Sequence, residues 1–134
     1  MKTLCYALIF SAFTASAQLA VLVSPPKIVG QKALVQLAMK NNFQQSVESA
    51  RAICFLMDEH GKMIGESTQW VIGENKLALQ PSATNTFNFV ITSRGGPFTT
   101  TNLTANVTFN RVVLENGKAA DPKSDVNIEK PKNN

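Results

Sequence analysis

Apolar and polar side chains alternate with a period of two along most of this chain, and that period is typical of β-strands with one buried face. The alternation is cleanest in residues 84–92, where Phe87, Phe89 and Ile91 share one face. Glycine, proline and asparagine separate such segments, as turns require. The segments that we expect to form strands are Leu19–Val23, Lys32–Lys40, Val47–Met57, Met63–Ile72, Thr84–Thr92 and Asn102–Leu114.

Two details predict where this pattern is interrupted. Ser24-Pro25-Pro26 ends the first segment, so we expect Leu19–Val23 to lie at the edge of a sheet. Along Asn102–Leu114 the alternation changes phase, which predicts a β-bulge near Asn110 or Arg111.

The segment Val47–Met57 fits either a strand or a helix. For the helix, Ser46 is a suitable N-cap and Gly61 a suitable stop. For the strand, the neighbouring segments alternate with period two, and Asp58–Gly61 has the composition of a hairpin turn. We therefore expect the strand, with Gly61 at a positive φ that other residues resist.

Short strands without helical segments between them predict an all-β, antiparallel sandwich of about five to seven strands. We expect the sandwich domain to span residues 18–115. Residues 116–134 mix basic and acidic side chains with two prolines and no aromatic residue, which predicts a polar and largely disordered tail. Within that tail, Asp125–Glu129 leaves open a short final strand.

Residues 1–17 have the features of a secretory signal peptide. Lys2 supplies a positive charge, Leu4–Ala15 is uncharged and mainly apolar, and the small residues Ala15-Ser16-Ala17 follow. The apolar run is shorter than the roughly 20 residues that span a bilayer. We expect a signal-peptide helix that is cleaved before Gln18, and a mature protein that is secreted or periplasmic.

The number and spacing of the charged residues bear on whether the partner is a nucleic acid or a membrane. Without Lys2 the chain has 12 basic and 9 acidic residues, and the basic ones are scattered singly. Because nucleic acids and anionic membranes bind clustered cations, we expect neither as a partner. No segment after residue 17 is long and apolar enough for a membrane span.

Candidate residues for catalysis are few. His60 is the only histidine, and it lies in the expected turn. Cys54 is the only cysteine besides Cys5, so after cleavage it has no intrachain disulfide partner, and we expect it to be a buried apolar residue. A nucleophile with a neighbouring base is therefore not indicated, and we expect a protein that is not an enzyme and has no cofactor.

One group of residues supports an alternative. Met57, His60 and Met63 are spaced three apart across the expected hairpin, which would bring the two methionines side by side. Thioether and imidazole ligands suit Cu(I) in an exported protein. Methionine also fills gaps in apolar cores routinely. These residues leave open a periplasmic or secreted copper-binding protein.

The order of these features resembles the FxLYD-type domain, an immunoglobulin-like β-sandwich of exported bacterial proteins. The matching positions are Asn41-Asn42-Phe43, Leu56, Asp58, Gly61-Lys62, Leu79-Gln80-Pro81 and Thr86-Phe87-Asn88-Phe89. Cys54 and Met57 stand where the family signature has phenylalanine and tyrosine. The resemblance covers roughly half of the mature chain and implies an immunoglobulin-like fold without catalytic residues.

These observations predict an exported, non-enzymatic β-sandwich that acts as a binding or structural module. An exposed strand edge is the expected contact surface, because its unpaired backbone groups accept another strand. The expected partner is a protein or another component of the cell envelope, and the sequence leaves its identity and the oligomeric state open.

Overall fold

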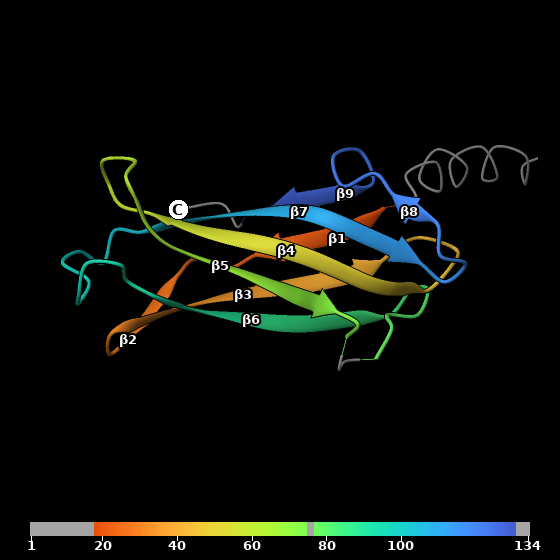
Figure 1. Cartoon of the computed structure of the whole chain (residues 1–134), viewed down its shortest axis with the longest axis horizontal. Helices are drawn as coiled ribbons and strands as arrows, with labels where there is room; N and C mark the ends of the chain where they lie inside the picture. Colours follow the sequence, from red (N-terminus) through yellow and green to blue (C-terminus); the bar gives the residue numbers. More distant parts are fainter. Residues whose placement is uncertain (1–17, 75–76, 131–134) are drawn as a thin grey trace, which may run out of the picture.

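The computed structural model describes residues 18–74 and 77–130, so the predicted signal peptide lies outside the described residues. Two β-sheets face each other and enclose the core between them (Figure 1). The strands are β1 (Leu19–Val23), β2 (Lys27–Val29), β3 (Lys32–Asn41), β4 (Val47–Met57), β5 (Met63–Ile72), β6 (Thr84–Thr92), β7 (Thr104–Leu114), β8 (Ala119–Ala120) and β9 (Val126–Glu129).

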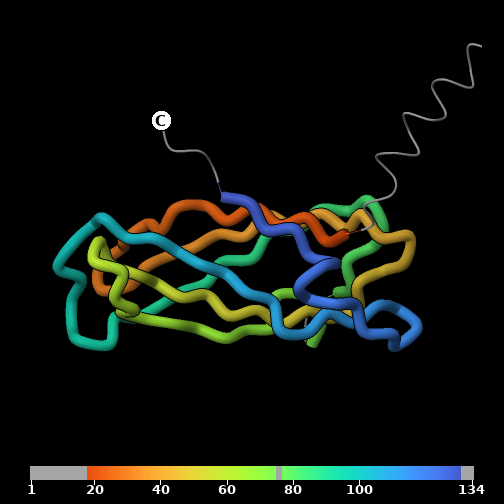
Figure 2. The backbone as a smooth tube through the Cα atoms, turned by 90° about the horizontal axis from the view of Figure 1, so that it is seen from above, coloured from red at the N-terminus to blue at the C-terminus, as the bar shows by residue number. Residues whose placement is uncertain are grey.

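Strand β3 lies at the centre of one sheet. It pairs with β1 and β2 along one side and with β6 along the other, and β9 extends this sheet beyond β1. The second sheet has the order β5-β4-β7-β8. Every pairing is antiparallel except that of β1 with β9, which is parallel. Figure 2 shows these two strands side by side.

The fold is therefore an all-β, largely antiparallel sandwich, as the alternation predicts. The chain changes sheet after β3, β5, β6 and β8, as in immunoglobulin-like sandwiches. Nine strands are formed by residues 18–74 and 77–130, more than the predicted range, because β2, β8 and β9 are too short to show alternation.

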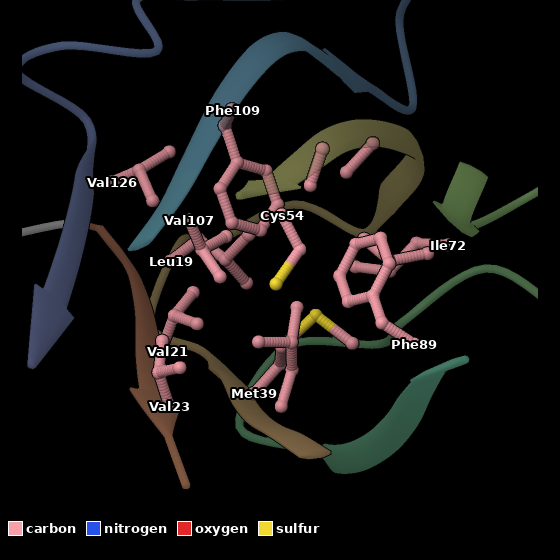
Figure 3. Packing of buried hydrophobic residues seen from close by; sticks show 14 of the residues in the cluster. Leu19, Val21, Val23, Met39, Cys54, Ile72, Phe89, Val107, Phe109 and Val126 are labelled. Carbon is pink, nitrogen blue, oxygen red and sulfur yellow. The ribbon is translucent and has the colours of Figure 1, made fainter. Parts of the chain in front are cut away.

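The core consists of the inward-facing residues of both sheets. Alternate positions of β3 and β4 are buried, as a period of two requires. Figure 3 shows the Cys54 sulfur of β4 pointing toward Met39 of β3 in the opposite sheet. Both side chains are almost completely buried, which confirms Cys54 as a core residue.

The ambiguous segment Val47–Met57 is a strand, and the hairpin after it has the predicted turn. The Gly61 N–H donates to the Asp58 carbonyl at 3.0 Å, and the Asp58 N–H donates to the Lys62 carbonyl at 2.9 Å. Gly61 has a φ of 79°, as expected for the residue that lets this turn close.

The predicted bulge in β7 is also present. Arg51 and Ala52 of β4 pair with Arg111 and Phe109, so Asn110 is the extra residue. A similar interruption in β5 was not predicted: Arg51 pairs with Trp70 while the preceding Ala50 pairs with Ile72.

The interruption in β5 changes which side chains face the core. Val71 and Ile72 are both buried, whereas Trp70 is only half-buried, with the Arg51 guanidinium 5.8 Å from its ring centre. Simple alternation puts Trp70 and Ile72 on one face, and the bulge is the reason that they separate.

The C-terminal segment is more ordered than its composition predicts. Ala119–Ala120 pairs with β7, and Val126–Glu129 pairs with β1. The Leu19 N–H also donates to the Asp125 carbonyl at 2.9 Å, and the Val126 side chain is buried. Backbone pairing stabilises a segment that has little apolar surface of its own.

Two predictions are corrected by this pairing. Residues 119–120 form a strand, and residues 126–129 form the short final strand that the sequence left open, so the described part of the segment is not a largely disordered tail; residues 131–134 lie outside the described part of the chain. The first strand, β1, does not lie at a sheet edge, because β9 covers its outer side. No helix in residues 18–74 and 77–130 is long and apolar enough to cross a membrane.

Candidate functional site

The first half of β7 has a strand on only one side. β8 pairs with Val112 and Val113 alone, and the chain then leaves this sheet to form β9 in the other one. Within the described part of the chain, Thr104–Asn110 therefore pairs with β4 and with no other strand. In such a strand every second backbone N–H and C=O group points away from its neighbour, toward solvent. We call this stretch, Thr104–Asn110, the free edge of β7.

The side chains of the free edge offer little protection against strand pairing. Ala105, Val107 and Phe109 point inward and are largely buried. The outward side chains are Thr104, Asn106, Thr108 and Asn110, all uncharged. Sheet edges are usually protected by charges, prolines or bulges, and among its own residues this edge has only the bulge at its far end.

A cleft runs between the free edge and β9. Its larger cavity, of about 570 Å³, is lined by Val107 and Phe109 on one side and by Pro122, Val126 and Ile128 on the other. Figure 3 shows Val107 and Phe109 on β7 across from Val126 on β9. The two strands belong to different sheets, so the cleft lies where the sandwich is open.

A smaller cavity, of about 100 Å³, lies at the start of β7. It is lined by Leu103, Thr104 and Ala105 and, from the other sheet, by Val23–Pro26 and Lys130. The two cavities together follow the free edge from Leu103 to Asn110.

Two lysines lie along this cleft. Lys123 lines the larger cavity and Lys130 the smaller one. The Lys130 ammonium donates a hydrogen bond to the Asn106 side-chain oxygen, so it reaches from the end of β9 to β7. Neither lysine forms an ion pair with a carboxylate of residues 18–74 or 77–130.

One carboxylate also lines the larger cavity. Asp121 accepts a hydrogen bond from the Lys123 backbone N–H at 2.9 Å, and this bond is the main reason that the pKa of Asp121 is lowered. Asp121 is thus held mainly by its own loop; the Lys123 charge adds a smaller lowering of its pKa, and the two side chains form no ion pair in the described residues.

The structure brings two of the three candidate copper ligands together. Met57 and Met63 are opposite each other in the β4–β5 pairing, and both are half-buried. His60 is exposed at the turn, where its backbone N–H donates to the Asp58 carboxylate at 2.9 Å. Backbone N–H groups, that of Lys62 first, lower the pKa of Asp58. No cluster of three His, Cys, Asp or Glu side chains suited to a metal occurs in the described residues.

In the described part of the chain, Cys54 has no base beside it that would activate it. Burial raises the pKa of its thiol to about 12, and the positive charge of Lys130 only partly opposes this effect. The thiolate is therefore strongly disfavoured at neutral pH, as expected for a buried cysteine.

The sequence predicts an exposed strand edge as the contact surface but does not indicate that β7 provides it. The free edge of β7 depends on the crossover from β8 to β9, which is a tertiary feature. One local signal was available: the seven residues from Thr104 to Asn110 contain no charge, proline or glycine, unlike Met63–Ile72.

Comparisons with known proteins show the fold alone. No family model matches the chain, and no curated protein matches it. The Northeast Structural Genomics Consortium target SoR45 has a similar structure, with a TM-score of 0.54 and 14% identity over 78% of this chain and 80% of that one. The putative ApaA protein from Bordetella pertussis is similar with a TM-score of 0.53 and 19% identity, over 77% of this chain and 86% of that one.

Proposed function

We propose that this protein is an exported, non-enzymatic binding module that associates with another protein through the free edge of β7. The observation that carries the proposal is the edge itself: its residues are uncharged, they pair with a strand on one side only within the described chain, and they lie beside a mainly apolar cleft. An extended segment that adds to a sheet edge gains affinity from main-chain hydrogen bonds and specificity from alternate side chains.

Export is the second part of the proposal, and the features of residues 1–17 support it. An intact mass of the protein recovered from the periplasm or the medium is expected to correspond to a chain that starts at Gln18, within a residue or two. Recovery of the uncleaved precursor in those fractions would contradict export by this signal.

The proposed membership of the FxLYD-type family is supported by the roles of three matching residues. Leu56 is buried in the core, and Asp58 accepts hydrogen bonds within the hairpin turn. Asn41 is buried, and its side-chain amide donates to the carbonyls of Gln45 and Leu79. Structural roles of this kind fit signature positions that maintain a fold.

A matched pair of variants tests the binding role. Thr108 of β7 and Thr68 of β5 both pair with Ile53 of β4, so they occupy the same row on opposite edges of one sheet. Thr108→Lys places a charge on the free edge, where it opposes the approach of another strand. We expect it to reduce the capture of partners from native cell-envelope extract at least about fivefold, as loss of an edge contact predicts.

Thr68→Lys is the control, because it adds the same charge to the other edge. It is expected to capture partners as the wild type does, and circular dichroism is expected to show both variants folded. Equal capture by Thr108→Lys and the wild type would remove the free edge of β7 as the binding surface.

The opposed methionines support a second candidate function, Cu(I) binding. Directly opposed residues of a hairpin place their side chains on the same face, which suits two thioether ligands at Met57 and Met63. His60→Ala and Met63→Leu are each expected to abolish tight Cu(I) binding without unfolding the domain. Titration of the wild-type protein with Cu(I) and a competing chelator is the measurement, and no stoichiometric binding would retire this candidate.

A further inference from the structure

We propose that the cleft between β7 and β9 accepts an extended segment of the partner protein, with apolar side chains at alternate positions and a carboxylate at each end. This inference rests on the proposed function and specifies the partner that the same edge would take. The segment would pair with Thr104–Asn110 through its backbone and fill the cleft with its inward side chains.

The residues that line the cleft determine which side chains of the partner segment are apolar. A strand laid against β7 points alternate side chains toward the interior, between the two sheets. There they would contact Val107 and Phe109 from β7 and Val126 and Ile128 from β9, all apolar. The side chains between them would face solvent beside Asn106 and Thr108 and need not be apolar.

A second folded copy of this chain fits the cleft less well. If two copies paired through their β7 edges, the inward residues Ala105, Val107 and Phe109 of each copy would already be buried in its own core. They would leave the cavity of about 570 Å³ unfilled. Only a segment with free side chains satisfies the backbone edge and the cavity together.

The two lysines of the cleft determine which charge the ends of the partner segment carry. Lys123 and Lys130 line the two cavities that follow the edge, and neither has an ion-pair partner in residues 18–74 or 77–130. Lys130 lies across the edge and donates to Asn106, a neutral acceptor. A carboxylate is a stronger acceptor for an ammonium group than an amide oxygen, so an acidic residue would replace Asn106 as its partner.

Synthetic peptides test this inference directly. The probe is a peptide of about eight residues, the length of an ordinary strand, with valine and threonine alternating and aspartate at both ends. A second peptide of the same composition groups the valines, and a third has lysine at both ends. Binding to the purified exported protein is measured by fluorescence anisotropy, and the site is mapped by NMR shifts of the backbone amides.

We expect the alternating acidic peptide to bind at least about fivefold more tightly than the lysine-ended one, because charge complementarity selects the partner. Lys130→Glu is expected to remove this preference, because Lys123 still favours aspartate at the other end, and the double variant Lys123→Glu with Lys130→Glu is expected to reverse it. Reversal in the double variant separates a charge contact from a loss of folding. The peptide with grouped valines is expected to bind at least about tenfold more weakly, since its side chains no longer match the period of two. Shifts are expected in Thr104–Asn110 and Val126–Lys130.

Equal binding of the alternating and grouped peptides, or shifts confined to another edge, would overturn the inference. A dimer in sedimentation that Thr108→Lys dissociates, together with no peptide binding, would show that a second copy occupies the edge instead. Loss of envelope capture in Thr108→Lys without peptide binding would overturn the inference but keep the proposed function. If capture is also unchanged, both fail.

Discussion

The two edges of the β5-β4-β7-β8 sheet are built differently, although both flank β4. On the β5 edge, Ser67 and Gln69 stand opposite the inward-facing Cys54 and Ala52, and their side chains are hydrogen-bonded to each other. On the β7 edge the corresponding residue opposite Cys54 is Val107. Polar residues at inward-facing edge positions discourage strand addition, whereas apolar ones favour it.

The start of the β5 edge is also in contact with the end of β6 and the segment that follows it. The Arg94 N–H donates to the Ile64 carbonyl at 3.0 Å, and the Arg94 side chain forms an ion pair with Glu66. A Cβ atom at Gly65 would lie 2.9 Å from Ile91 Cγ2 on β6, so the two sheets are in close contact there. The fold therefore makes specific contacts with the start of the β5 edge, whereas Thr104–Asn110 of β7 has no second strand within the described residues.

The largest expected effect on stability comes from enlarging the side chains that stand opposite Leu56 on the two sides of β4. Gly65 and Ala105 both pair with Leu56, one on each side of β4. Gly65→Ala is expected to destabilise the protein by about 1–3 kcal/mol, because Ile91 and the Thr92 carbonyl must move. Ala105→Val is expected to cost less than about 1 kcal/mol, because a cavity adjoins it.

Urea unfolding of the two variants and the wild type measures this difference. A large loss of stability in Ala105→Val would show that the β7 side is as tightly packed as the β5 side. The contrast between the edges would then be wrong.

An intermediate effect is expected from Cys54, which lies between the two edges. The pKa of its thiol is 9.0 when exposed and about 12 in the fold. Between these values the unfolded chain loses the proton and the folded chain keeps it, so stability falls as the pH rises. The slope contributed by this group is at most about 1.4 kcal/mol per pH unit.

Cys54→Ala is the reference for that measurement. It is expected to cost about 1–2 kcal/mol at neutral pH as a core truncation, and to lack the alkaline slope. The difference in unfolding free energy between the two proteins is measured from neutral to alkaline pH. Fast reaction of the native thiol with a labelling reagent would contradict its burial, while slower labelling after peptide binding would indicate that access is through the β7 edge.

The smallest effect is expected from the ion pair on the β5 edge. The side chains of Arg94 and Glu66 are 55% and 40% exposed, and such surface pairs contribute less than about 1 kcal/mol. Arg94→Ala is therefore expected to change global stability little, but to speed hydrogen exchange at the β5 edge. Unchanged exchange there would mean that Gly65 and the Ile64 carbonyl close that edge without the ion pair.

The sequence predicts the strands well where each carries its own alternation. Val47–Met57, Met63–Ile72 and Thr84–Thr92 have the predicted bounds, and the change of phase in β7 locates its bulge at Asn110. The sequence left β9 open without establishing it, because Val126 is its one buried residue and its pairing with β1 is a long-range backbone contact. The same long-range contact decides which strand edge is free. The sequence therefore predicts that an exposed edge is the contact surface, but it does not show that this edge belongs to β7.

The pairing of β1 with β9 has a consequence for when this protein can fold. Leu19 pairs with Val126, so β1 gains this neighbouring strand only after β9 has been synthesised, more than 100 residues later in the chain. Contacts between distant parts of a chain require closure of a long loop and slow the folding reaction. A nascent chain still lacking β9 therefore stays open for longer, and under the export that we propose this open state suits passage through a narrow translocation channel. The arrival of β9 then completes the pairing of β1.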